Sequence, residues 1–387
     1  MRLVPAILFT SCAILFQYYQ PVSAQTISDT QDYKVRVTKV VEGLYHPWSM
    51  AFLPDGRMLV TERLGQLRIV DNGKLLVAPV VGIPKATEHG QGGLLDIVLH
   101  PKYAENGWIY WSYNAIDAVG LHGTELARGK LGGTRDMPRM TDVQVLFRLQ
   151  PKSSAGQHFG SRIVFDRQGY LYLTLGDRGD SPARGAAQRA QQLNDHAGKS
   201  IRLHDDGRVP ADNPFVKTPA ALPEIYSSGH RNMQGAVLHP DTGRVWTHEH
   251  GPQGGDEINI LTAGANYGWP VITYGANYGI GTKIGEGTAK PGMMQPLLYW
   301  VPSIAPSGMA FYSGKSFPKW KGNLFVGALA KQLLMRVTLD GEKVVAQERI
   351  LEGKLGRIRD VREGPDGNLY LLTDSAAGEL IRLEPVK

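Results

Sequence analysis

The stretch RIVFDRQGYLYLTLGD (162–177) contains two apolar runs joined by a polar turn. Its second run alternates at period two, which is typical of a β-strand. The two faces of this run are Tyr170, Tyr172 and Thr174 on one side and Leu171, Leu173 and Leu175 on the other. The turn contains Gln168-Gly169, and glycine at such a turn is typical of a β-hairpin. The stretch therefore predicts a pair of antiparallel strands.

The same pattern occurs six times along the chain. The other copies are MAFLPDGRMLVTE (50–62), DIVLHPKYAENGWIYWSY (96–113), AVLHPDTGRVWTHEHG (236–251), GMAFYSGKSFPKWKGNLFVGA (308–328) and DVREGPDGNLYLLTD (360–374). Each copy is followed by a third strand-like run: QLRIVDNG, LARGKL, SIRLHDDG, EINILTAG, LMRVTLDG and ELIRLEP. Such repetition is typical of sheets arranged around an axis. We therefore expect an all-β, six-bladed β-propeller with four-stranded antiparallel blades around a central axis.

Residues 1–24 have the features of a secretory signal peptide. Arg2 precedes the apolar run LVPAILFTSCAILF, and Val22-Ser23-Ala24 is typical of a cleavage site before Gln25. The apolar run is too short and too interrupted for a membrane span, which needs about 20 residues. The part before Cys12 is also too short for a lipoprotein site. We expect residues 25–387 to form a single propeller domain in the periplasm or outside the cell.

The composition excludes several classes of function. Cys12 is the only cysteine, so the mature chain has neither disulfides nor cysteine metal sites. Of the 42 Lys and Arg residues, 41 remain without Arg2, against 36 Asp and Glu, a net charge of +5. The basic residues form no run of the kind that binds nucleic acid. Neither a P-loop nor a zinc-protease motif occurs, and the glycines of 279–285 lack dinucleotide-binding spacing.

The middle units are more widely spaced than the first two and the last two. The additional length lies in residues 115–158, 178–200, 209–234 and 266–306. Long loops on a rigid scaffold commonly carry binding functions, so we expect these segments to determine substrate specificity. Within them, AAQRAQQLN (186–194) predicts a short helix.

Polar residues gather just before the first strand of four units, in the segments 90–93, 156–160, 229–234 and 357–360. In a propeller, the start of each innermost strand opens onto the central axis. Residues far apart in the sequence are therefore expected to converge on one funnel. The residues concerned are Gln91, His158, Arg231, Asn232, Arg357 and Arg359.

These segments carry a resemblance to a known family. The chain is similar to the soluble quinoprotein aldose sugar dehydrogenases of the glucose/sorbosone dehydrogenase family, which use pyrroloquinoline quinone (PQQ). The matching segments, in order from Pro47 to near the C-terminus, are PWSMAFLPDGRMLVTER, GQGGLLDIVLHP, GQHFGSRIVFD, LTLGDRG, SGHRNMQG, EHGPQGGDEIN, ANYGWP and GRIRDV. Each segment is weak alone, whereas their shared order is specific.

The resemblance implies the roles of several residues. His158 would be the general base for the anomeric hydroxyl, a task that suits a near-neutral pKa, and Asp177 would orient it. Arg231 and Asn232 would lie near the quinone oxygens, where Arg231 would stabilise negative charge on the reducing quinone. The further residues that match contacts of PQQ are Gln91, Lys331, Arg357 and Arg359.

Calcium is the metal that the resemblance implies, because calcium prefers oxygen ligands, including backbone carbonyls. The carbonyls of Gly251 and Pro252 match ligands of an ion that bridges to PQQ. Glu257 and the carbonyl of Tyr267 resemble a second, structural calcium site. Asp256 and Glu257 are equally well explained as surface charge.

Two further sets of residues have alternative interpretations. His248 and His250 alternate along one strand and could form a transition-metal pair, although the sequence supplies no third ligand. Trp269, Tyr274 and Tyr278 could form an aromatic wall for a flat cofactor or a sugar ring. Core packing explains Trp269 equally well, and Tyr278 is the favoured cofactor contact.

The leading hypothesis is a PQQ- and calcium-dependent oxidoreductase that converts the C1 hydroxyl of an aldose, such as glucose, into a lactone. Its electrons would pass to an external acceptor, a quinone or a small redox protein. Two alternatives remain: a propeller that binds carbohydrate or protein without redox chemistry, and a metal-dependent lactonase. The sequence selects neither a particular aldose nor between a monomer and a dimer.

Overall fold

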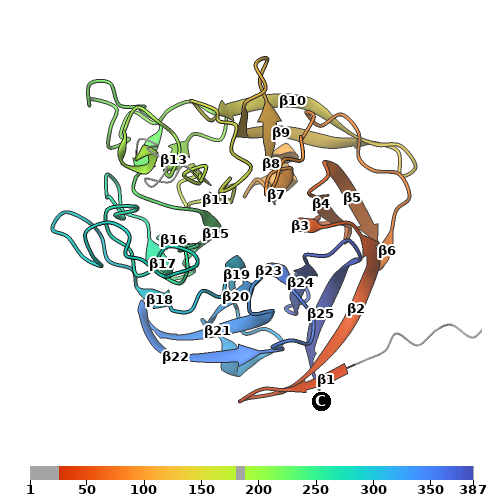
Figure 1. The fold of residues 1–387 in the computed structure, drawn as a ribbon. Coiled ribbons are helices and arrows are strands. Elements are labelled where there is room, and N and C mark those ends of the chain that lie inside the picture. The colour runs from red at the N-terminus through yellow and green to blue at the C-terminus, as the bar shows by residue number, and fades with distance from the viewer. Residues whose placement is uncertain (1–25, 180–187, 387) are drawn as a thin grey trace, which may run out of the picture.

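Six antiparallel sheets surround a central axis in the computed structural model (Figure 1). The model describes residues 26–179 and 188–386, so the signal peptide expected at residues 1–24 lies outside the described residues. Five sheets have four strands and the sixth has five. The prediction of an all-β, six-bladed propeller is confirmed.

The strands follow the chain around the ring, blade by blade. The first blade contains β3 (Pro47–Phe52), β4 (Met58–Glu62), β5 (Gln66–Asp71) and β6 (Lys74–Leu75). The second contains β7 (Leu94–Leu99), β8 (Trp108–Ile116), β9 (His122–Gly133) and β10 (Pro138–Arg148). The third contains β11 (Ile163–Phe165), β12 (Leu171–Thr174), β13 (Ser200–Leu203) and β14 (Ile225–Ser227).

The remaining blades continue this order. The fourth contains β15 (Met233–Leu238), β16 (Val245–Glu249), β17 (Asp256–Ile260) and β18 (Leu298–Trp300). The fifth contains β19 (Pro306–Phe311), β20 (Leu324–Ala328), β21 (Leu333–Asp340) and β22 (Lys343–Ile350). The sixth contains β23 (Ile358–Glu363), β24 (Leu369–Thr373), β25 (Gly378–Pro385), β2 (Lys34–Leu44) and β1 (Thr26–Asp29).

The sixth blade closes the ring because it combines both ends of the described chain. β2 pairs with β25, placing Val37 opposite Leu383. β1 then pairs with β2 as a fifth, outermost strand. The hydrogen bonds between β2 and β25 join the first and last parts of the propeller, so the ring is closed within one sheet.

In residues 26–179 and 188–386, helical structure is limited to single turns. They are α1 (Tyr103–Asn106) and the 3-10 turns η2 (Arg189–Gln191) and η3 (Pro318–Trp320). A helix was predicted over 186–194; its described part, 188–194, contains only the turn η2, and residues 186 and 187 lie outside the described residues. Among the described residues, none of the helices has the length and apolar character that a membrane span requires.

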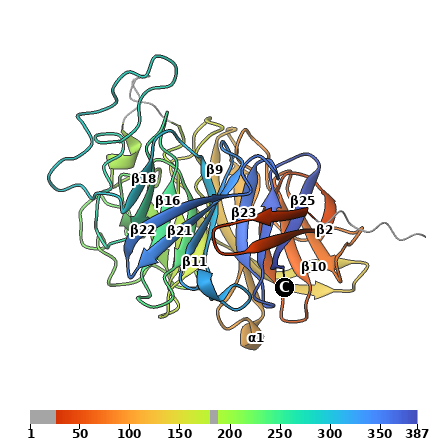
Figure 2. The same ribbon diagram turned by 90° about the horizontal axis from the view of Figure 1, so that it is seen from below.

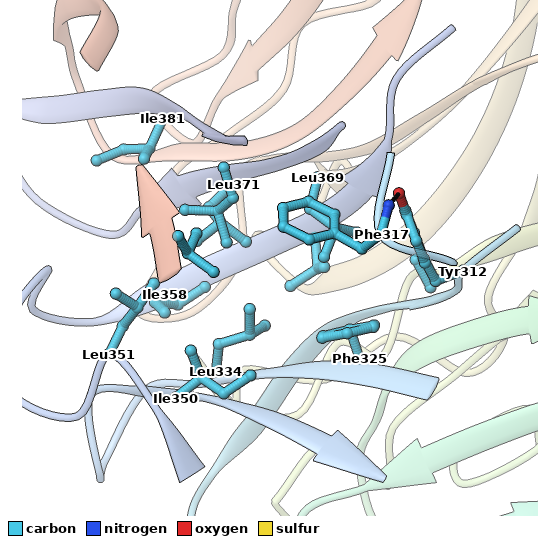
Figure 3. Packing of buried hydrophobic residues seen from close by; sticks show 14 of the residues in the cluster. Tyr312, Phe317, Phe325, Leu334, Ile350, Leu351, Ile358, Leu369, Leu371 and Ile381 are labelled. Carbon is cyan, nitrogen blue, oxygen red and sulfur yellow. Dashed lines mark hydrogen bonds between the residues drawn. The ribbon is translucent and has the colours of Figure 1, made fainter. Parts of the chain in front are cut away.

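Apolar side chains fill the spaces between blades. The cluster between the fifth and sixth blades includes Phe317, Phe325, Leu334, Ile358 and Leu371, all of them fully buried (Figure 3). Burying one such side chain stabilises a fold by about 1.5–3 kcal/mol. The blades are thus held as a rigid ring on which the loops of one face can present a site.

The expected long loop at 115–158 is largely a β-hairpin. β9 and β10 occupy most of it, with Phe147 opposite Leu126. The prediction missed β10 because this outer strand alternates imperfectly between buried and exposed residues. In contrast, much of the long segment between β17 and β18 is irregular and extends from the face opposite α1 (Figure 2).

Candidate active site

One cavity of about 590 Å³ lies where the third and fourth blades meet the long segment after β17. Its volume is within the range of small-molecule sites. The lining residues are Gln157, His158, Asp177, Gly179, Gln188, Arg231, Pro252, Trp269, Pro270, Val271, Asn277, Tyr278, Lys283, Ile284, Gly285 and Glu286. Five of the residues named from the sequence as catalytic, cofactor or metal contacts line this cavity: His158, Asp177, Arg231, Pro252 and Tyr278.

His158 lies in the turn just before β11 and has a left-handed backbone, with φ of 51°. A non-glycine residue adopts this conformation only when its surroundings hold it there. Its N–H donates to Oε1 of Gln91 at 2.9 Å. On the other side the turn packs so closely against Gly176 that a Cβ at Gly176 would lie 2.2 Å from the carbonyl oxygen of His158. Glycine at 176 is therefore required for this approach.

The His158 ring forms a hydrogen-bonded pair with Asp177. Its Nδ1 lies 2.6 Å from Oδ1 of Asp177, and both side chains are buried. Burial lowers the pKa of His158 below its usual value of 6.5, and the nearby Arg231 charge adds to this effect. A neutral imidazole next to an ionised carboxylate carries its proton on Nδ1. The lone pair is then on Nε2, where it can accept a proton.

Asp177 is held as a carboxylate by several partners. Burial acts to raise its pKa, but His158, Arg231 and the N–H of Gly179 together hold the pKa below its usual value. The Gly179 N–H donates to Oδ1 at 2.7 Å, and the indole Nε1 of Trp269 donates to Oδ2 at 2.7 Å. The carboxylate thus fixes the orientation of the histidine ring.

Arg231 enters the cavity from the segment before β15. Its Nη1 donates to the carbonyls of His250 at 3.0 Å and Gly251 at 2.7 Å. Its guanidinium carbon lies 5.3 Å from the ring centre of Trp269. A buried guanidinium in this position can stabilise negative charge that develops on a bound group.

A second hydrogen-bonded chain supports Arg231 from behind. Ser227 Oγ lies 2.8 Å from Nε2 of His230, and Nδ1 of His230 lies 2.9 Å from Oε1 of Glu249. This order resembles the triad of a serine hydrolase, but Ser227 and His230 are fully buried, so no substrate can reach the hydroxyl. Glu249 also accepts the N–H of Arg231 at 2.5 Å, which indicates a structural role.

Three cationic residues expected to contact PQQ lie near the sixth blade, outside the lining of the cavity: Lys331, Arg357 and Arg359. Arg359 is buried and donates to Oε1 of Gln234 at 2.9 Å and to Oδ2 of Asp374 at 2.6 Å. The side chain of Arg357 is 46% exposed and lies 3.4 Å from the same carboxylate. Lys331 is half-buried in the turn between β20 and β21. The sequence prediction that Arg357 and Arg359 line one pocket with His158 is therefore not met by this cavity.

Gln91 and Asn232 also lie outside the lining, and each contacts the backbone of the turn that carries His158. Oδ1 of Asn232 accepts the N–H of Gly160 at 3.1 Å, as Gln91 accepts that of His158. Their observed role is to hold this turn. Among the residues expected to contact PQQ, three buried donor atoms lack a hydrogen-bond partner in the described chain: Nε of Arg231, Nδ2 of Asn232 and Nε of Arg359. Buried donors normally have partners, so these atoms fit a ligand rich in acceptor oxygens.

Three of the four residues expected to bind calcium surround a second, much smaller space, whereas Pro252 lines the larger cavity. A cavity of about 10 Å³ is lined by Glu249, Gly251, Glu257 and Tyr267, among others, and this volume accommodates about one water-sized sphere. Burial and the adjacent Glu249 raise the pKa of Glu257 to about 8. The buried Glu249 and the half-buried Glu257, beside backbone carbonyls, form a donor set that fits a hard cation. Asp256 is fully buried and Glu257 is half-buried at this cavity, so neither is a freely exposed surface charge.

The alternative metal pair does not form. His248 is fully buried, and a Cβ at Gly235 would lie 2.1 Å from its Nε2. His250 instead contacts the carbonyl of Pro306, and burial lowers its pKa to about 3. Within residues 26–179 and 188–386, no group of three His, Cys, Asp or Glu side chains is placed to hold a metal.

The aromatic residues of the long segment have different positions. Tyr278 is 70% exposed at the cavity, while Tyr274 stacks on Tyr299 with ring centres 3.8 Å apart and does not line it. The sequence analysis did not predict the hydrogen bond from Trp269 to Asp177, because no pattern in the sequence brings residues 177 and 269 together. Lys283 and Glu286 were missed for the same reason.

The fold and the cavity together define a class: a six-bladed β-propeller with a polar small-molecule site at one end of its ring. The sequence model of the Glucose / Sorbosone dehydrogenase family matches residues 44–382, and the chain belongs to this family.

Individual relatives agree with this assignment. The chain is 47% identical over 354 residues to aldose sugar dehydrogenase YliI of Escherichia coli K12, covering 91% of this chain and 93% of the relative. It superposes on the apo-form structure of the soluble aldose sugar dehydrogenase from Escherichia coli with a TM-score of 0.86 and 46% identity, covering 91% and 100% of the two chains. It also matches the PQQ-bound aldose sugar dehydrogenase from Streptomyces coelicolor, with a TM-score of 0.73, 28% identity and coverage of 91% and 98%.

Proposed function

We propose that this protein is a PQQ- and calcium-dependent aldose sugar dehydrogenase. It would oxidise the C1 hydroxyl of an aldose to a lactone and pass the two electrons to an external acceptor, a quinone or a small redox protein. Support comes from membership of the family, from the aldose sugar dehydrogenase of Escherichia coli at 47% identity, and from the PQQ-bound relative of Streptomyces coelicolor.

The observation that carries the proposal is the His158–Asp177 pair at the cavity, with its Nδ1–Oδ1 distance of 2.6 Å. Oxidation of an alcohol requires loss of the hydroxyl proton together with a hydride from the same carbon. Nε2 of the neutral His158 ring would take the C1 hydroxyl proton as general base. Asp177 would hold the ring in the required tautomer and stabilise the imidazolium that results.

When bound, PQQ would supply the ortho-quinone that accepts the hydride from C1, and calcium would supply the Lewis acid at the quinone carbonyl. Arg231 would stabilise negative charge at this carbonyl, and the unpaired Nδ2 of Asn232 would donate to the same region. Lys331, Arg357 and Arg359 would bind the three carboxylates that PQQ carries. Gln91 would act on the site through the backbone of His158, and Tyr278 would cover its open side.

For the metals, the carbonyls of Gly251 and Pro252 would hold the ion next to PQQ. Glu257 and the carbonyl of Tyr267 would hold a second, structural calcium in the small cavity. The fit of that cavity rests on its size and on its paired carboxylates, Glu249 and Glu257.

We further propose that the mature chain begins at Gln25, is exported to the periplasm or beyond, and forms one propeller domain. The N-terminal segment of residues 1–24 supports export through its charge, apolar run and cleavage pattern.

The decisive experiment is reconstitution of the purified protein with PQQ and calcium. We expect reduction of an electron-accepting dye when a panel of aldoses is supplied, with the corresponding lactone as product. A parallel assay of lactone hydrolysis separates dehydrogenase from lactonase. If PQQ does not bind and no aldose reduces the dye, the proposed function is wrong.

A further inference from the structure

Arg178 directly follows Asp177 and is fully buried, although its side chain carries a charge. Its Nη1 donates to the carbonyl oxygen of Gln157 at 2.6 Å, and its Nη2 donates to that of Ala155. Its guanidinium carbon lies 3.5 Å from the ring centre of Phe159. A single guanidinium group thus contacts the residues on both sides of His158.

These contacts restrain the backbone at His158, which has an unfavourable conformation. His158 has a φ of 51°, in the left-handed region that a histidine rarely adopts. Gln91 holds its N–H from one side, and Arg178 holds the carbonyls from the other. A change of backbone conformation at residue 158 would turn the imidazole away from Oδ1 of Asp177.

We propose that Arg178 is a positioning residue for His158: it clamps the 155–159 turn so that Nδ1 of His158 stays on Asp177 and Nε2 faces the cavity. This inference rests on the proposed function, in which His158 is the base. Because a planar guanidinium can bind two carbonyls at once and an ammonium group cannot do so in the same geometry, lysine should replace arginine poorly.

Two substitutions separate the clamp from the charge. Arg178→Met removes both, whereas Arg178→Lys keeps the charge and loses the paired contact. Arg167→Met is the matched control, because Arg167 also donates to two backbone carbonyls, those of Pro240 and Asp241, in a hairpin away from the cavity.

In steady-state assays, we expect both variants of Arg178 to lower kcat by about 10- to 100-fold, the effect of a misplaced catalytic group. KM for the aldose should change by less than about threefold, since substrate binding is retained. The Arg167 control should keep wild-type kcat.

The pH profile should distinguish the two variants of Arg178. The charged and titratable groups around His158 are Asp177, Arg231, Arg178 and His250. Loss of a positive charge favours the imidazolium, so Arg178→Met should move the acid limb of kcat/KM to higher pH. Arg178→Lys keeps the positive charge, so its acid limb should lie at lower pH than that of Arg178→Met, while kcat falls in both.

Hydrogen–deuterium exchange of the protein without PQQ tests the clamp independently of activity. Both Arg178 variants should exchange faster at residues 155–160, and the Arg167 control should not. If the wild-type protein failed to oxidise any aldose while this exchange pattern held, the proposed function would be wrong and the clamp would stand. Wild-type exchange at 155–160 together with wild-type kcat in Arg178→Met would overturn the inference.

Discussion

The indole Nε1 of Trp269 donates to Oδ2 of Asp177 at 2.7 Å, the carboxylate oxygen that is not bonded to His158. Trp269 comes from the segment after β17, whereas Asp177 follows β12, so two blades meet at this bond. The hydrogen bond stabilises the ionised carboxylate and reduces the negative charge that the histidine ring experiences. Trp269 therefore influences the basicity of His158 without contacting it through a hydrogen bond.

Trp269→Phe should raise the pKa of His158, because the carboxylate of Asp177 would lose a donor and favour the imidazolium more strongly. Since only the neutral ring can act as a base, kcat/KM should fall on the acid side. Its acid limb should move up by at most about 1 pH unit. Trp246→Phe is the control, because that indole is fully buried and lacks a hydrogen-bond partner within the described chain. If the acid limb of the kcat/KM profile did not move in Trp269→Phe, the role given to the hydrogen bond from Trp269 to Asp177 would be wrong.

The repeat was sufficient to predict the propeller, because each of its six copies combines strand alternation with a turn. It could not show that β1 and β2 complete the last blade, since those strands lie outside the repeated motif. In the site, the G-Q-H-F-G and L-G-D-R segments pointed to His158 and Asp177. The bond from Trp269 depends on how the long segment folds over the ring, and a sequence pattern does not encode that contact.

His158→Ala should retain PQQ and lose most of its turnover, because the side chain takes the proton but the cations hold the cofactor. Removal of a general base lowers kcat by roughly 100- to 10,000-fold. His158→Asn is a useful second variant, as asparagine tolerates the left-handed backbone found at this position. Absorbance titration with PQQ measures binding, and dye reduction measures kcat. Unchanged turnover in both variants would exclude His158 as the base.

Arg357→Gln should weaken PQQ binding while leaving the fold intact. The side chain of Arg357 is 46% exposed, and its partner Asp374 keeps the shorter bond to Arg359. Loss of one charge-assisted contact should raise the Kd for PQQ by about tenfold, or about 1.4 kcal/mol. Arg349→Gln, at an exposed arginine paired with Glu352, provides the control. Equal Kd values for the two variants would remove Arg357 from the set of cofactor ligands.

His248 should make stability depend on pH below about 6.5. Burial lowers its pKa well below the usual value of 6.5, so the unfolded chain gains a proton before the folded one does. The stability associated with the neutral ring is therefore complete above pH 6.5 and decreases as the pH falls toward the folded-state pKa. The decrease approaches about 1.4 kcal/mol per pH unit. Denaturant unfolding at several pH values gives the free energy of unfolding as a function of pH. This free energy should fall less steeply with decreasing pH in His248→Gln than in the wild type. Identical slopes for the two proteins would contradict the prediction.

Glu257→Gln should stabilise the calcium-free protein and remove the stabilisation that calcium provides. In the small cavity, burial and the neighbouring Glu249 raise the pKa of Glu257 to about 8, so its charged form is unfavourable near neutral pH without a cation. In Glu257→Gln, the neutral amide removes the repulsion between residues 249 and 257, but an amide binds calcium more weakly than a carboxylate does. In the wild type, calcium at 100 times its Kd should add about 2.7 kcal/mol to the free energy of unfolding. Thermal unfolding with calcium or with a chelator measures the difference, and the exposed Glu352→Gln is the control. A full calcium shift in Glu257→Gln would place the ion elsewhere.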